Sequence, residues 1–218
     1  MQIRAETLAE AHMEICKEIY AFGDEVITED GDITFEYPEP VLLIITNPIS
    51  ESMVSVLCKF GQKAMAKYSE QLLYGCDSGF VYTYHERLFE YLCECGVKVD
   101  QIHNLIEKLK IDPTSRRAQA ITWYPNTDMD SGNPPCLQRI QFLIRGGKLN
   151  MDVNFRSNDC LSALGQNMFV FAHLLEYVAE SLCLPIGVYT HYITSAHIYL
   201  IRDASEMGPI RLAICGYS

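Results

Sequence analysis

The chain has 218 residues, 49% of them hydrophobic and 21% charged, which is enough to bury a sizeable core, so we expect a single domain over residues 1–218. The formal net charge of −11 argues against nucleic acid as the main partner, because a phosphate backbone binds to a basic surface. No apolar run reaches the roughly 18 residues that a membrane span needs, and the N-terminus is too polar for a signal peptide. We therefore expect a cytoplasmic protein without a membrane partner.

The nine cysteines favour a reducing compartment. Their number is odd and their spacings are scattered, and we find neither a disulfide framework nor the paired C-x-x-C motifs of a zinc site. Most of these thiols are expected to be small buried hydrophobic residues, and no metal site is predicted.

The first half of the chain is predicted to be mainly helical. The Asp30-Gly31 pair indicates the turn of a hairpin over residues 25–34, and residues 41–46 form a short apolar strand. Gly23, Gly75 and Asp112-Pro113 are typical helix ends. The expected helices span residues 5–22, 53–74, 84–93 and 99–110.

The second half is richer in strands. Two segments with alternating apolar residues meet at Gly146-Gly147, which predicts a second hairpin. Before it come a strand and a polar loop, and after it a long apolar helix and a final strand, over residues 118–123, 126–135, 161–183 and 187–201. The expected fold is α+β, with one mixed sheet and helices packed against it.

Cys136 stands out among the cysteines because it follows Pro134-Pro135 at the end of the polar loop. The prolines restrict the backbone that leads into the next strand. A cysteine becomes a nucleophile as the thiolate, and a nearby arginine lowers its pKa. The alternative is an inert cysteine buried in a strand.

Two arginine motifs could bind an anion against the negative charge of the whole chain. These are Arg116-Arg117 and Arg156-Ser157. Arginine suits phosphate because its guanidinium donates two parallel hydrogen bonds. For Arg116-Arg117, the alternative is an ordinary solvated pair after a helix end.

Four further polar residues follow in the second half. Asp159 is either a functional carboxylate or a helix cap, and Asn167 lies in an apolar helix, where its amide needs a base edge or an internal network as partner. His197 and Tyr199 share one strand face and would suit sugar hydroxyls, or are ordinary half-buried residues. Together with Cys136 and the arginines they form a candidate nucleotide site.

The order of these motifs resembles the thymidylate synthase family. Its pattern is matched by Pro135-Cys136, Arg156-Ser157-Asn158-Asp159, Asn167 and His197-Ile198-Tyr199. Upstream, Asp112-Pro113-Thr114-Ser115-Arg116-Arg117 and Ala120-Ile121-Thr122-Trp123 also resemble family segments. The resemblance covers about residues 81 to 202, and the compact N-terminal third resembles the short archaeal branch.

The resemblance implies a reaction, the reductive methylation of dUMP to dTMP. Cys136 would attack C6 of the uracil ring, and 5,10-methylene-tetrahydrofolate or a related reduced pterin would be the cofactor. Arg156 and Ser157 would hold the phosphate, and Arg156 would also favour the thiolate.

The resemblance also implies roles for the remaining motif residues. Asp159 would orient the pterin, Asn167 would bind the O4 and N3 edge of uracil, and Tyr84 would assist proton removal from C5. His197 and Tyr199 would bind the deoxyribose 3′-hydroxyl.

A homodimer that forms through the sheet is implied as well. In it, Arg116 and Arg117 would reach the phosphate in the neighbouring subunit's site.

Several positions depart from the family pattern. Leu137 stands where most members have histidine, and Phe155 stands where they have glutamine. The tryptophan-containing helix that carries the catalytic glutamate is not recognisable, which leaves Glu51, Glu70 and Glu86 as candidates. The chain ends at residues 215–218, short of the tail that usually closes over the cofactor.

Two alternatives stay open. The first is a nucleotide hydroxymethylase acting on dUMP or dCMP, in which water rather than hydride would quench the intermediate. Asn167 favours uracil, because enzymes acting on dCMP are expected to have aspartate there. The second is a non-catalytic nucleotide-binding homologue.

Overall fold

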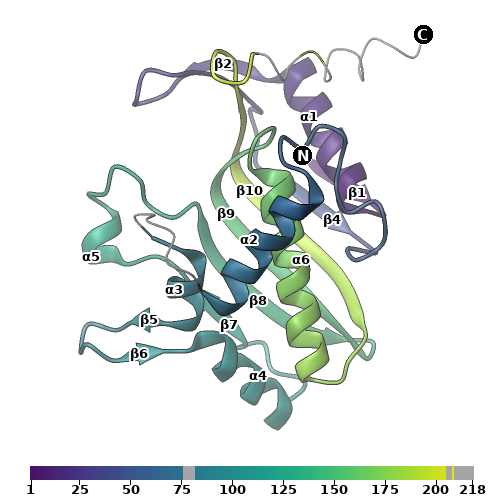
Figure 1. Ribbon diagram of the computed structural model, residues 1–218, viewed down its shortest axis with the longest axis vertical. Coiled ribbons are helices and arrows are strands. Elements are labelled where there is room, and N and C mark those ends of the chain that lie inside the picture. The colour runs from purple at the N-terminus through teal and green to yellow at the C-terminus, as the bar shows by residue number, and fades with distance from the viewer. Residues whose placement is uncertain (76–81, 205–207, 209–218) are drawn as a thin grey trace.

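The computed structural model describes residues 1–75, 82–204 and 208, and it shows an α+β fold in which helices pack on a mixed sheet (Figure 1). The strands follow the order β1-β4-β10-β9-β8-β7, and β3 pairs with the far end of β10 and with β2. The main strands are β1 (Gln2–Ala5), β2 (Asp24–Ile27), β3 (Ile33–Glu36), β4 (Val41–Ile45), β7 (Gln119–Ile121), β8 (Leu137–Arg145), β9 (Lys148–Asp159) and β10 (Ile186–Tyr199). The expected fold class is confirmed.

The three longest strands form the centre of the sheet. β9 pairs antiparallel with β8 and parallel with β10, and β10 pairs antiparallel with β4. Gly146 and Gly147 join β8 to β9 with φ angles of 58° and 73°, a conformation that glycine adopts without strain. The predicted second hairpin is therefore confirmed, and it positions the ends of β8 and β9 side by side.

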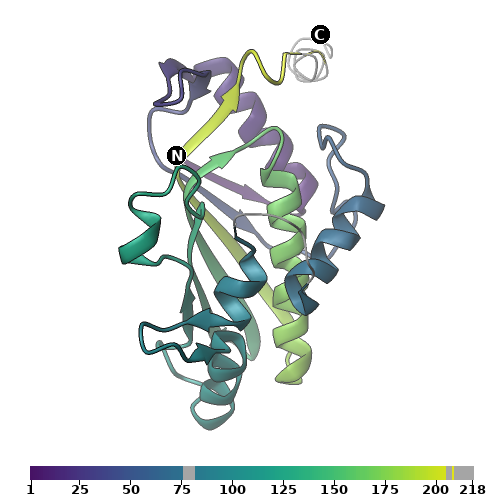
Figure 2. The same ribbon diagram turned by 60° about the vertical axis from the view of Figure 1, so that its left-hand side comes forward.

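Three helices, α1, α6 and α2, form two further layers on one face of this sheet (Figure 2). α6 contacts β9 and β10, α1 lies beside it, and α2 packs against α6. In the described part of the chain no helix packs on the other face of β8 to β10 in this view. The helices are α1 (Leu8–Phe22), α2 (Gln62–Tyr74), α3 (Tyr84–Phe89), α4 (Gln101–Ile111), α5 (Pro125–Asp128) and α6 (Leu164–Ser181).

Burial explains why α6 lies at the centre. Its apolar residues are buried around most of the helix, which is typical of a helix between two layers. α1 instead buries one stripe against the sheet, formed by Leu8, Ala11, Ile15 and Ile19. No helix in the described ranges is long and apolar enough to cross a membrane.

Two helices begin later than the sequence suggests. The first predicted helix starts at Leu8, because Ala5 pairs with Ile45 in the sheet and Thr7 caps the helix by accepting a hydrogen bond from the Glu10 amide. The helix predicted over residues 53–74 starts at Gln62. Residues 53–61 instead form turns, in which the hydroxyl of Ser55 accepts a hydrogen bond from the Leu57 amide at 3.0 Å.

The next two helices also differ from the prediction at the ends that face each other. The helix predicted over residues 84–93 ends at Phe89, because β5 (Tyr91–Leu92) pairs with β6 (Lys98–Val99). The helix predicted from residue 99 begins at Gln101, after Asp100 caps its first turn.

The polar loop before Cys136 contains one helical turn, α5, which the sequence did not indicate. A buried ion pair anchors it: the Arg87 guanidinium donates to both carboxylate oxygens of Asp128 at 2.8 Å. Arg87 also donates to the Thr122 carbonyl at 2.9 Å, and its guanidinium lies 3.9 Å from the centre of the Tyr124 ring. The loop that leads to Cys136 is thereby fixed to α3 and β7.

Candidate active site

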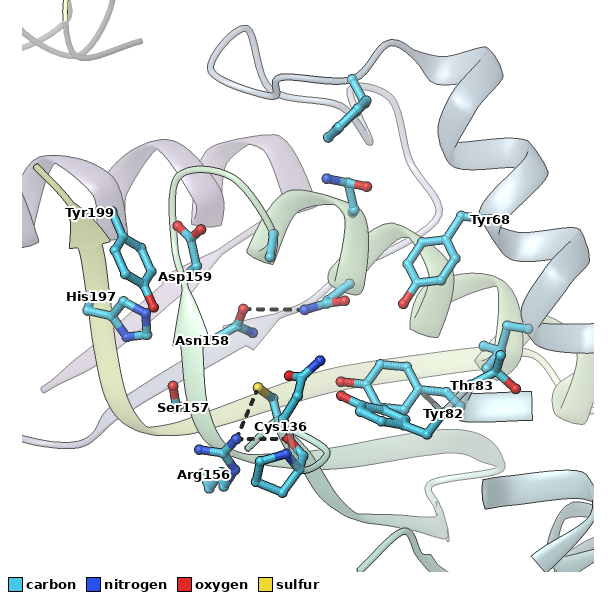
Figure 3. A pocket seen from close by; sticks show the side chains of 18 of the residues that line it. Tyr68, Tyr82, Thr83, Cys136, Arg156, Ser157, Asn158, Asp159, His197 and Tyr199 are labelled. Atoms are coloured by element: carbon cyan, nitrogen blue, oxygen red, sulfur yellow. Dashed lines mark hydrogen bonds between the residues drawn. The ribbon is translucent and has the colours of Figure 1, made fainter. Parts of the chain in front are cut away.

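A pocket of about 1380 Å³ opens where the ends of β8, β9 and β10 meet α2, α3 and α6 (Figure 3). The turn of the β2–β3 hairpin completes its wall. Eight of the predicted site residues line it: Tyr84, Cys136, Arg156, Ser157, Asp159, Asn167, His197 and Tyr199.

Cys136 and Arg156 form the centre of this pocket (Figure 3). The Arg156 amide donates to the Cys136 carbonyl at 2.9 Å, so the β8–β9 pairing sets the distance between the two residues. The guanidinium then donates to the carbonyls of Pro134 and Pro135 at 2.9 and 3.1 Å, and its Nη2 lies 3.8 Å from the Cys136 sulfur. The two prolines therefore hold the guanidinium beside the thiol.

The thiol is nevertheless protonated in this pocket at neutral pH. Burial raises the pKa of Cys136 above its ordinary value, Arg156 lowers it by less, and the Asp159 carboxylate raises it. Arg156 lowers the pKa of the thiol as expected, but desolvation outweighs this one guanidinium. Arg156 still stabilises the thiolate once it forms.

Tyrosines form the wall opposite His197 and Tyr199 (Figure 3). The oxygen of Tyr84 accepts a hydrogen bond from the Leu137 amide at 3.3 Å, directly beside Cys136. Burial, together with Tyr82, Tyr68 and the thiol, raises the pKa of Tyr84 well above its usual value, so the hydroxyl keeps its proton at neutral pH. Tyr84 can therefore donate a hydrogen bond into the pocket.

Asp159 both caps a turn and forms an ion pair. Its carboxylate accepts from the Ser162 amide at 3.1 Å and binds the Arg202 guanidinium, which lies 3.8 Å from the centre of the Tyr199 ring. His197 is the β10 partner of Asp159 in the sheet, and burial lowers its pKa, against the opposing effect of this carboxylate. The ring is thus a neutral donor and acceptor at the pocket edge.

Asn167 takes part in an internal hydrogen-bond network, and its contact with a base edge stays a prediction. Its side chain lines the pocket, and its Nδ2 donates to the Asn158 Oδ1 at 3.3 Å. The amide therefore presents its remaining donor and its acceptor from a buried and oriented position.

Arg116 and Arg117 are not brought to this pocket within one chain. Both are exposed on the loop between α4 and β7, where they line a second, smaller hollow of about 350 Å³. Their predicted reach into a neighbouring subunit stays a prediction. Of the three glutamates, Glu70 lines the main pocket, Glu86 caps α3 through Thr83, and Glu51 is not among the described lining residues.

The part of the chain that contains these motifs matches a known protein family. The family model described as thymidylate synthase matches residues 50–206. The chain belongs to the thymidylate synthase family.

Similar archaeal proteins support this family assignment. A Methanocaldococcus jannaschii protein named "Putative thymidylate synthase" is 42% identical over 206 residues, 92% of this chain and 91% of the relative. Proteins of the same name from Methanosarcina mazei and Methanothermobacter marburgensis are 35% and 32% identical, and the matches cover 90% and 94% of this chain and 88% and 97% of those relatives. The predicted resemblance to archaeal members is confirmed.

The structure places further residues at the pocket of this thymidylate synthase family member. Tyr68 and Gln166 come from helices, and Glu29 and Asp30 come from the hairpin turn. Sequence reasoning missed them as site residues because a lone helical or turn residue carries no signal of what it faces. Tyr82 could have been found, since it lies two residues before Tyr84.

The two departures from the family pattern next to Cys136 are both buried. Leu137 is fully buried at the start of β8, and Phe155 stacks on His191 with ring centres 4.6 Å apart. Residues 215–218 lie outside the described residues.

A reduced pterin fits the pocket by size and by chemistry. The volume of about 1380 Å³ exceeds the roughly 300–1,000 Å³ of a usual ligand pocket, so a second ring system has room beside a nucleotide. Tyr68 and Tyr82 offer aromatic faces, and Asp159 offers a carboxylate to ring N–H groups.

Proposed function

We propose that the protein is a thymidylate synthase that converts dUMP to dTMP. The observation that carries this proposal is the pair of Cys136 and Arg156, whose sulfur and Nη2 lie 3.8 Å apart at the centre of a large pocket in a member of this family. A half-buried thiol beside a guanidinium suits a nucleophile that must add to a ring and later leave it.

Cys136 begins the reaction. Its thiolate forms a bond to C6 of uracil, and the electron pair of the C5–C6 double bond moves to C5. After one-carbon transfer to C5, the C5 proton leaves, the sulfur–C6 bond breaks and the double bond is restored. Arg156 stabilises the thiolate at both ends of this cycle, and the hydroxyl of Tyr84 hydrogen-bonds groups near C5.

The other polar residues bind and orient dUMP. Arg156 and Ser157 hold the phosphate. The guanidinium supplies a local positive charge in a chain whose net charge is −11. Asn167 binds the O4 and N3 edge of the base, and His197 and Tyr199 bind the 3′-hydroxyl from the strand face that they share.

A reduced pterin, when bound, supplies the one-carbon unit and the hydride that turns it into a methyl group. Asp159 orients this ring, and Tyr68 and Tyr82 exclude water from beside it.

A homodimer completes the site in this proposal. The sheet face without a packed helix in the described chain would form the interface, and exposed Arg116 and Arg117 would reach the partner's phosphate site. The arginine charges would then come from both subunits.

Tritium release from C5-labelled dUMP tests the function, with several reduced pterins supplied in turn. We expect release by the wild-type protein and a loss of at least about 10³-fold in Cys136→Ser, because a hydroxyl is a far weaker nucleophile than a thiolate. Cys183→Ser, which alters an exposed cysteine, serves as the control.

Three results would contradict the proposal. Full activity of Cys136→Ser would remove the nucleophile, and dUMP binding without release under any pterin would indicate a binding protein. A hydroxymethyl rather than a methyl product in mass analysis would indicate a hydroxymethylase.

A further inference from the structure

A buried chain of hydrogen bonds runs from the pocket into the sheet. Asn167 Nδ2 donates to Asn158 Oδ1 at 3.3 Å, and Asn158 Nδ2 lies 3.2 Å from His191 Nε2. The other ring nitrogen of His191, Nδ1, lies 2.7 Å from the hydroxyl of Tyr189. Asn167 lines the pocket, whereas His191 and Tyr189 are fully buried behind it.

The donors and acceptors of this chain depend on one another. Because Asn158 Nδ2 is a donor, His191 Nε2 must accept, and the proton of the neutral ring must then lie on Nδ1 and point to the Tyr189 oxygen. Burial lowers the pKa of His191 to about 3, so the ring stays neutral at physiological pH. The ring also stacks on Phe155, with 15° between the two planes, which restricts its rotation.

This dependence opposes rotation of the Asn167 amide. If Asn167 turned over, its Oδ1 would face the Oδ1 of Asn158. If Asn158 turned over as well, its Oδ1 would face the unprotonated Nε2 of His191. Each arrangement buries two facing acceptors, which costs more than a lost hydrogen bond. Relief requires the His191 ring to move its proton to the other nitrogen and the Tyr189 hydroxyl to turn and donate to Nδ1, so all four groups must reverse together.

We propose that His191 is a positioning residue that, through Asn158, holds the Asn167 amide in one orientation and thereby makes the site prefer uracil to cytosine. The inference rests on the proposed function, because it takes Asn167 as the reader of the base. Uracil offers an acceptor at O4 and a donor at N3, whereas cytosine offers a donor and an acceptor at these positions. An amide free to turn over would bind both, and a fixed amide binds one.

Nitrogen-15 NMR of the unliganded protein tests the tautomer that we assign to His191. We expect His191 to show a protonated Nδ1 and an unprotonated Nε2, although Nε2–H is the commoner form of a neutral histidine in water. This readout needs no nucleotide. A protonated Nε2 would overturn the proposed polarity, and with it the inference.

Tyr189→Phe tests whether this tautomer fixes the orientation of the Asn167 amide, at a position that does not line the pocket. The change leaves a proton on Nδ1 buried without an acceptor, so the tautomer protonated on Nε2 is favoured and the two amides turn over together. We expect the ratio of the dissociation constants for dCMP and dUMP to fall roughly tenfold or more, as for the loss of one well-placed hydrogen bond. Tyr192→Phe, on the opposite face of the same strand, should leave the ratio unchanged.

His191→Gln provides a second variant if Tyr189→Phe does not fold. Glutamine can donate or accept by turning its amide, so it fills the position without fixing the polarity, and the ratio should again fall. Unchanged ratios in the folded variants, with tight dUMP binding by the wild type, would overturn the inference alone. No binding of either nucleotide by the wild type would overturn the proposed function and the inference together.

Discussion

The ionisation of Cys136 is the property on which the proposed chemistry depends at the scale of single residues. Burial raises the pKa of this thiol, and two charges act on it in opposite directions: Arg156 lowers the pKa and Asp159 raises it. The free protein therefore holds the sulfur mostly as a thiol, with the guanidinium that stabilises the thiolate already in place. The reactivity of the sulfur is thus controlled by its neighbours.

Two substitutions should shift the thiol pKa in opposite directions. Arg156→Leu removes the charge that favours the thiolate, so the rate of alkylation by iodoacetamide at pH 8 should fall several-fold. Asp159→Asn removes a charge that opposes the thiolate, so the rate should rise. Mass spectrometry of the peptide that contains Cys136 measures the rate apart from the other cysteines.

The pH profile of the same reaction supplies the control. The midpoint should move up in Arg156→Leu and down in Asp159→Asn, while the rate of exposed Cys183 should not change. Midpoints that move in the same direction would contradict this account of the thiol.

The loop that carries α5 is the element whose anchoring matters most for the site. The buried Arg87–Asp128 pair ties it to α3, and its end leads directly into Pro134, Pro135 and Cys136. A loop of this polarity would otherwise be mobile, and the prolines would not hold the Arg156 guanidinium beside the sulfur.

Asp128→Ala should lower the free energy of unfolding by about 3–5 kcal/mol, because it leaves the buried Arg87 guanidinium without its partner. It also removes the acceptor of the Tyr124 amide. Urea unfolding monitored by circular dichroism measures the change. The matched control is Asp130→Ala, an exposed aspartate two residues along the same loop, which should change the free energy by no more than about 0.5 kcal/mol. Equal effects of the two changes would rule out the ion pair as the cause.

The strands of the second half could be predicted because alternation and a Gly-Gly turn are local signals. The start of α2 could not, because Met53 and Leu57 have helical spacing while the hydroxyl of Ser55 stabilises a turn between them. Likewise, Val99 fits the pattern of α4 but pairs with Tyr91. Competing hydrogen bonds of this kind determine where a helix begins or ends. They involve residues that the spacing of apolar residues does not identify.

The motif residues of the candidate site could be predicted from the sequence, but the residues that form the rest of the pocket wall could not. Cys136, Arg156 and Asp159 come from motifs with fixed spacing, and the structure brings them together. Tyr68 and Asp30 reach the pocket through the packing of α2 and the hairpin, which depends on long-range contacts. The raised pKa of Cys136 escaped prediction for the same reason, since burial is a property of the assembled fold.

Buried histidines affect the whole molecule through its stability toward acid. His12 is buried between α1 and the end of β9, where its Nε2 lies 2.7 Å from the Cys160 carbonyl and Cys58 approaches its other nitrogen. Burial lowers its pKa from 6.5 to about 4. Between these values the unfolded chain binds a proton that the folded chain does not, so stability falls as the pH falls through this window.

His12→Gln should make the loss of stability in acid shallower. Each pH unit between 6.5 and 4 costs the wild type about 1.4 kcal/mol through this histidine, so about 2 kcal/mol between pH 7 and pH 5 should disappear in the variant. Urea unfolding at the two pH values measures the difference. His103→Gln, at an exposed position on α4, should keep the wild-type dependence. An unchanged slope in His12→Gln would show that the histidine gains its proton in the folded state.

The proposed dimer makes a prediction at the scale of the assembly. Cys136→Ser and the double variant Arg116→Ala, Arg117→Ala should each be inactive alone, because one lacks the nucleophile and the other lacks the phosphate charges. After mixing and subunit exchange, half of the dimers would be hybrids with one complete site, so about a quarter of the wild-type activity should return. Activity that stays absent in a confirmed hybrid dimer would place the arginines outside the partner's site.

The single backbone hydrogen bond between the Arg156 amide and the Cys136 carbonyl has a consequence for motion. It extends the pairing of β8 and β9 just beyond the first residue of β8, so the sulfur and the guanidinium are attached to one rigid unit. The tyrosine wall, the hairpin turn and α2 belong to other parts of the fold. A movement of those other parts around a ligand would change the volume of the pocket without separating the reactive pair. The sheet would thus fix the distance between the two reactive groups, and the surrounding elements would determine how far the pocket opens.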